Sequence, residues 1–133
     1  MRTRFILIET SHAGNVGSVA RAMKVMGFDD LVLVRPRWAD VLQREEALAL
    51  ASGADDVLAR ARIVPTLDEA LDGVSHVCAT AMTPRDFGPP TVAPRAHLAE
   101  LAARLLSPAA VSLGVTAADP AGQADGVAPT ESV

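Results

Sequence analysis

The sequence predicts an α/β fold in which a parallel sheet is covered by helices on both faces. Short apolar runs of strand length alternate with segments whose apolar residues recur at helical spacing, from residue 4 to residue 113. This alternation is typical of parallel strands joined by crossover helices. The chain has 133 residues, of which 50% are hydrophobic, and this is enough material for one domain with a core.

In the front half, strand and helix signals follow one another closely. Asn15 is a suitable N-cap for the first helix and Gly27 a suitable stop. A capping box at residues 66–69 opens a short further helix. The predicted strands span 4–9, 31–34 and 62–64, and the predicted helices span 16–28, 44–52 and 55–59.

In the back half, residues 75–81 are predicted to form a core strand that leads into a Pro-rich loop. A helix over 94–106 and a final strand over 109–113 follow. From residue 115 the sequence is small, polar and aperiodic, which is typical of disorder. The expected organisation is therefore one domain over 1–114 and a disordered tail over 115–133.

Composition excludes several classes of function. With three Phe, one Trp and no Tyr, a base-stacking aromatic platform is not expected. The net charge is −4, yet the first 37 residues are locally basic. This basic segment suits phosphate binding, and the alternative is that its charges are scattered over the solvated surface. The lone Cys78 excludes an internal disulfide and is expected to be buried and inert. No metal-ligand spacing, membrane span or signal peptide is present, which predicts a cytoplasmic protein without a metal.

The loop over residues 11–18 is the first candidate for chemistry. Ligands of open α/β sheets bind beyond the C-terminal ends of the strands, where this loop begins. Helix N-terminal amides together with Asn15, Ser18 and Arg21 would form an anion site, although many such loops merely turn the chain. A dinucleotide site requires G-x-G-x-x-G, whereas this loop offers only Gly14-x-x-Gly17, and the second strand ends in Arg35-Pro36 where an acidic residue would stand. A Walker A loop lacks its Gly-Lys-Ser/Thr ending.

Four stretches, taken together, resemble the TrmJ-type tRNA ribose 2′-O-methyltransferases of the SpoU/TrmH superfamily and SPOUT class. The first runs from Ile8 to Phe28 and contains an Asn followed six residues later by an Arg. The others match in order and spacing at 31–34, 51–58 and 66–71. The likeness covers residue 4 to about Gly114.

This resemblance implies an S-adenosyl-L-methionine-dependent enzyme that acts as a homodimer on tRNA and has a trefoil-knotted C-terminal part. Arg21 would position the ribose 2′-hydroxyl and stabilise its charge, and Asn15 would support the same pocket. The implied cofactor contacts are Thr80, Ala81, Met82 and Gly114. The implied RNA contacts are Ser11, His12, Ser18, Lys24 and Arg85, with a turn carbonyl as the alternative partner of His12. Thr83 stands where relatives tend to carry a second Arg, which predicts weaker RNA affinity.

The likeness stops at Gly114, where relatives continue with an Arg-containing loop, a helix and a Ser-Leu-Asn segment. The sequence therefore predicts that the knotted part is truncated or diverged. A frame disruption just after codon 114 would explain the abrupt change. The alternative to an enzyme is a non-catalytic remnant of the family that binds RNA or dimerises.

Overall fold

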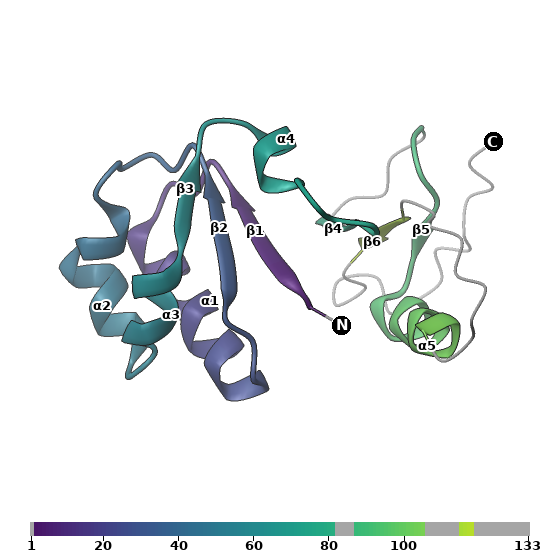
Figure 1. The fold of residues 1–133 in the computed structure, drawn as a ribbon, viewed down its shortest axis with the longest axis horizontal. Helices are drawn as coiled ribbons and strands as arrows, with labels where there is room; N and C mark the ends of the chain where they lie inside the picture. Colours follow the sequence, from purple (N-terminus) through teal and green to yellow (C-terminus); the bar gives the residue numbers. More distant parts are fainter. Residues whose placement is uncertain (1, 82–86, 106–114, 119–133) are drawn as a thin grey trace, which may run out of the picture. The chain divides into compact units, whose positions relative to one another are not determined.

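Two three-stranded parallel sheets form the framework of the chain, which confirms the predicted fold class. The computed structural model describes residues 2–81, 87–105 and 115–118. It divides the chain into two units, Met1–Asp72 and Gly73–Val133, where the sequence predicts a single domain over 1–114. Each unit contains one of the sheets (Figure 1).

The first unit alternates strands and helices in the predicted order. Its elements are β1 (Arg4–Ile8), α1 (Ala13–Met26), β2 (Asp30–Val34), the 3₁₀ turn η1 (Val41–Gln43), α2 (Glu45–Ala51), α3 (Asp55–Arg60), β3 (Arg62–Val64) and α4 (Leu67–Ala70). The strands are ordered β1-β2-β3, and the central β2 is buried over its whole length. The predicted buried first strand is only half-buried, because β1 lies at an edge of this sheet.

Side chains on β2 divide between two cores, as the alternation of a strand requires. Leu31 and Leu33 face the larger core, which α1, α2 and α3 cover. Val32 and Val34 face the smaller one, to which α4 contributes Ala70. Helices thus cover both faces of this sheet, and the face with the smaller core is covered by the short helix α4.

Helix α1 starts three residues earlier than the sequence predicts. His12, not Asn15, is its N-cap, and the His12 side chain makes no capping hydrogen bond. Gly14 and Gly17 therefore lie inside the helix, where both are buried against α2. Gly14 lies before the predicted helix over 16–28, so its expected place in a turn is wrong, whereas Gly17 lies in the helix as predicted. Both glycines allow two helices to approach closely. The predicted stop is confirmed: Gly27 ends α1 with a φ of 81°.

The second unit contains β4 (Cys78–Ala81), β5 (Thr91–Val92), α5 (Pro94–Leu105) and β6 (Val115–Ala118), with strand order β4-β6-β5. Strand β6 stands where the sequence predicts the start of a disordered tail. The predicted final strand over 109–113 lies outside the described residues.

Two burial predictions for the second unit are wrong. Cys78 is exposed, and β4 is four residues of small side chains rather than a long core strand. On α5, Leu98 is 57% exposed while His97 is buried. His97 instead meets His76, with 3.2 Å between their Nε2 atoms.

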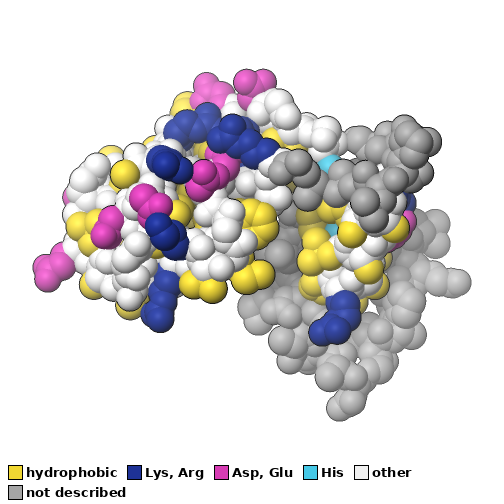
Figure 2. All heavy atoms as spheres, turned by 60° about the horizontal axis from the view of Figure 1, so that its bottom comes forward, with side chains coloured by type: hydrophobic (Ala, Val, Ile, Leu, Met, Phe, Trp, Pro, Cys, Tyr) yellow, Lys and Arg dark blue, Asp and Glu magenta, His cyan; other side chains and the backbone are white. Residues whose placement is uncertain are grey.

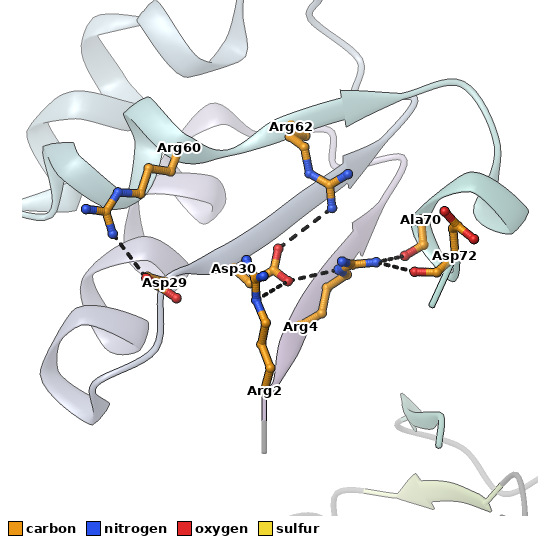
Figure 3. Close-up of polar contacts among 8 residues, drawn as sticks. All are labelled: Arg2, Arg4, Asp29, Asp30, Arg60, Arg62, Ala70 and Asp72. Carbon is orange, nitrogen blue, oxygen red and sulfur yellow. Dashed lines mark hydrogen bonds and ion pairs between the residues drawn. The ribbon is translucent and has the colours of Figure 1, made fainter. Parts of the chain in front are cut away.

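Charged side chains of both signs gather on the surface of the first unit (Figure 2). At the N-terminal ends of its strands, the buried carboxylate of Asp30 is shared by three guanidinium groups (Figure 3). Arg4 lies 3.0 Å away and also donates to the carbonyl oxygens of Ala70 and Asp72. Arg2 and Arg62 lie 3.3 and 3.8 Å away. Asp30 thus joins the starts of all three strands.

Replacing Asp30 with asparagine should lower the free energy of unfolding by about 2 kcal/mol, because charge-assisted hydrogen bonds are lost at a buried acceptor. Urea unfolding measures this change. Asp29→Asn is the matched control, since Asp29 pairs with Arg60 at the exposed surface and should cost about 0.5 kcal/mol or less. Equal losses in the two variants would contradict this role of Asp30.

Candidate functional site

The C-terminal ends of β1 and β2 are joined by polar contacts just beyond the strands. Glu9 and Arg35, the residues that follow β1 and β2, both adopt positive φ, 52° and 44°. Their side chains form an exposed ion pair of 2.8 Å. The Glu9 amide donates to the Val34 carbonyl, and the Arg37 amide donates to the Thr10 carbonyl. Non-glycine residues at positive φ carry strain and cluster at functional sites.

Helix α1 begins near these strand ends and carries a row of exposed polar side chains, which we call the ridge. Asn15, Ser18 and Arg21 are spaced three residues apart, so they follow one another along one side of the helix. No acidic residue occupies the first turn of α1, so its amide dipoles are not neutralised from within the helix. The structure brings these three predicted residues together on one ridge.

The position of Arg21 differs from the anion site that the sequence suggests at the start of the helix. Because α1 begins at Ala13, the Arg21 backbone lies about 12 Å along the helix axis from that end. Long helical side chains lean toward the N-terminus, which shortens this separation for the guanidinium group. Among the residues that the structure describes, Arg21 has no hydrogen-bond or ion-pair partner, and it is exposed. Its charge is available to a ligand.

The other predicted RNA contacts in the first unit have different surroundings. Ser11 and His12 are exposed in the connection between β1 and α1. Lys24 is engaged already, since its ammonium group donates to Asp56 at 2.7 Å. This hydrogen bond lowers the pKa of the Asp56 carboxyl. The ion pair therefore stabilises the folded chain at pH values above the usual pKa of a carboxyl group. This stabilisation is lost as the pH falls through the lowered pKa of Asp56.

Two of the predicted cofactor contacts, Thr80 and Ala81, form the end of β4 in the second unit. Strand β4 consists of Cys78, two alanines and a threonine. Met82, Gly114 and the predicted RNA contact Arg85 lie outside the described residues.

The described residues contain no group of three His, Cys, Asp or Glu side chains arranged to hold a metal ion. No helix in residues 2–81, 87–105 and 115–118 is long and apolar enough to cross a membrane.

Sequence reasoning missed the contacts that follow β2. The Glu9–Arg35 ion pair was not predicted, nor was the approach of two guanidinium groups to Trp38. The available signal was the basic segment Arg35-Pro36-Arg37, which directly follows a buried strand.

The SpoU rRNA Methylase family matches residues 2–114 of the chain. A protein of Salmonella typhimurium described as tRNA (cytidine/uridine-2′-O-)-methyltransferase TrmJ is 52% identical over 92 residues. That match covers 69% of this chain and 37% of the relative. The TrmJ protein of Shigella dysenteriae is also 52% identical over 92 residues, which are 36% of its length. The chain thus spans little more than a third of these curated relatives.

Solved structures with the same fold come from similar proteins. A probable methyltransferase from Bordetella pertussis superposes with a TM-score of 0.71 at 47% identity, covering 87% of this chain and 68% of that one. TrmJ from Z. mobilis superposes with a TM-score of 0.67 at 35% identity, covering 91% of this chain and 51% of that one. The predicted likeness is thereby confirmed in sequence and in fold.

Proposed function

Because the chain belongs to the SpoU rRNA Methylase family, we propose that it is an RNA ribose 2′-O-methyltransferase of the TrmJ kind. The proposed donor is S-adenosyl-L-methionine, and the proposed substrate is a ribose in the anticodon loop of tRNA. The activity for which the 52% identical relatives are named supports this reaction and this class of RNA.

The observation that carries the proposal is the exposed ridge of Asn15, Ser18 and Arg21 within the matched region. A ribose hydroxyl is a weak nucleophile that develops negative charge as it attacks. A fixed cation beside the oxygen stabilises that charge most strongly in the transition state. Arg21 supplies such a cation, and no described carboxylate neutralises it.

Arg21 is assigned to positioning and charge stabilisation rather than to proton removal. A guanidinium group stays protonated in proteins and cannot act as the base. The hydroxyl proton therefore leaves to another acceptor, such as a phosphate oxygen of the substrate. Asn15, six residues earlier on the same ridge, would hold the ribose by hydrogen bonds. The donor, when bound, supplies an electrophilic methyl group on a sulfonium.

The same proposal extends to the predicted RNA and cofactor contacts. Ser11, His12 and Ser18 are exposed near the start of α1, which supports contact with a large polyanion. Thr80 and Ala81 would contact the donor, because ligands of parallel sheets bind at the carboxyl ends of the strands. Lys24 would contact RNA only by sharing or leaving its ion pair with Asp56.

We further propose a cytoplasmic homodimer. An RNA substrate supports the compartment, and apolar exposure on α1 supports the association. Val25 and Met26, near the end of the helix, are 78% and 71% exposed. Exposed large apolar side chains can form part of a surface that meets another protein.

A non-catalytic remnant that binds RNA or dimerises is the second candidate. The exposed ridge of α1 fits this candidate as well, because an arginine without a carboxylate partner among the described residues can bind RNA without catalysing methyl transfer.

Isothermal titration of the purified chain with S-adenosyl-L-methionine separates the two candidates. The enzyme requires saturable binding with one donor per chain, because transfer cannot occur without a donor site. Binding of unmodified tRNA without any binding of the donor would support the remnant and contradict the enzyme.

A further inference from the structure

Trp38 lies beneath two guanidinium groups in the segment that follows β2. The Cζ atoms of Arg37 and Arg44 lie 4.8 and 3.9 Å from the centroid of the indole ring. The indole also packs against the larger core of the first unit. An aromatic ring anchored in this way is a rigid support for a cation, and cation–π attraction holds the cation over it.

The segment around Trp38 lies at the same sheet edge as the start of α1. The Arg37 amide donates to the Thr10 carbonyl at 3.1 Å, which ties this segment to the connection between β1 and α1. Ser11 and His12, two predicted RNA contacts, follow Thr10 directly. Arg37 is therefore fixed beside the candidate site at the level of its backbone.

The basic side chains at this edge differ in whether a carboxylate pairs with their positive charge. Arg35 pairs with Glu9 at 2.8 Å, and Arg44 pairs with Asp40 at 3.0 Å. Arg37 is exposed and has no carboxylate partner among the residues that the structure describes. Its guanidinium group is held over a ring while its N–H donors remain unsatisfied by protein carboxylates.

A guanidinium group of this kind suits a phosphate. Arg presents planar, paired donors that match phosphate oxygens, and it can stack on an aromatic ring at the same time. Holding the side chain in advance also reduces the conformational entropy that binding would cost. A carboxylate already in place would compete for these donors, and Arg37 has none in the described chain.

We propose that Arg37, supported by Trp38, binds a backbone phosphate of the substrate RNA. This inference rests on the proposed function and adds an RNA contact that the resemblance did not assign. The phosphate contact would hold the RNA at the edge where β1 and β2 end, beside the ridge of α1.

The test is equilibrium binding of unmodified tRNA to the whole chain over a series of salt concentrations. Arg37→Ala should weaken binding by about five-fold, the upper range for one exposed charge pair. It should also reduce the slope of log affinity against log salt by roughly 0.7 to 0.9, the contribution of one phosphate contact. Arg37→Lys retains the charge and should retain most of the salt slope.

Arg62→Ala is the matched control, because it removes the same charge at the opposite ends of the strands, where Arg62 faces Asp30. It should leave affinity and salt slope unchanged. If Arg37→Ala binds tRNA as the wild type does, or if both variants lose affinity equally, the inference is overturned and the proposed function stands. A wild-type chain that binds no tRNA at any salt concentration overturns the proposed function together with the inference.

Discussion

Replacing Arg21 with alanine is expected to lower the rate of methyl transfer to tRNA by about 100- to 1,000-fold, the usual effect of removing one group that stabilises transition-state charge. The loss should appear in kcat as well as in kcat/KM, because the interaction strengthens as the hydroxyl oxygen gains charge. Transfer of a radiolabelled methyl group to unmodified tRNA measures both constants.

The exposure of Arg21 makes this result interpretable. Since the side chain has no partner among the described residues, its removal should leave the urea unfolding midpoint unchanged. Arg62→Ala serves again as a control for loss of one positive charge, and it should keep the wild-type rate. An active wild type together with a fully active Arg21→Ala variant would show that the catalytic assignment is wrong.

Replacing Gly17 with alanine is expected to destabilise the chain by about 3 kcal/mol, because rigid backbone lies against this position. An added Cβ would overlap the carbonyl oxygen of Ala47 and lie 2.9 Å from the amide nitrogen of Ala51. Both atoms belong to α2, so α1 and α2 must separate to admit the methyl group. Urea unfolding followed by circular dichroism measures the change.

Gly14→Ala is the matched control on the same helix. Its Cβ would meet the ends of flexible side chains, Leu50 Cδ1 at 2.6 Å and Glu46 Oε1 at 2.9 Å. These can move, and alanine favours a helix over glycine by about 1 kcal/mol, so the net change should be within about 1 kcal/mol. If Gly17→Ala is no more costly than Gly14→Ala, the close approach of the two helices is not what requires Gly17.

Local sequence signals predicted most of the first unit. The apolar runs at β1 and β2, the stop at Gly27 and the cap at Thr66 are all decided by nearby residues. The start of α1 could not be predicted in this way. A glycine that ends a turn and a glycine that admits a second helix look alike in sequence, and only the packing of α2 distinguishes Gly14 from a turn residue.

The candidate site was predicted in part for a similar reason. The motif shared with the family predicts functional roles for Asn15, Ser18 and Arg21. Their helical spacing alone predicts that they lie on one ridge. The ion pair between Lys24 and Asp56 joins two separate helices, α1 and α3. No local sequence pattern predicts such a contact. The same holds for Arg37 and Thr10, which parallel strand pairing brings together across 27 residues of chain.

The proposed ribose methyltransferase activity of this chain is tested most directly by an analysis of the reaction product. Unmodified tRNA would be incubated with the chain and S-adenosyl-L-methionine, digested to nucleosides and examined by mass spectrometry. We expect a nucleoside that carries the new methyl group on its ribose 2′-oxygen. A methyl group on a base, or no methylation under conditions in which the chain binds the donor and tRNA, would contradict the account.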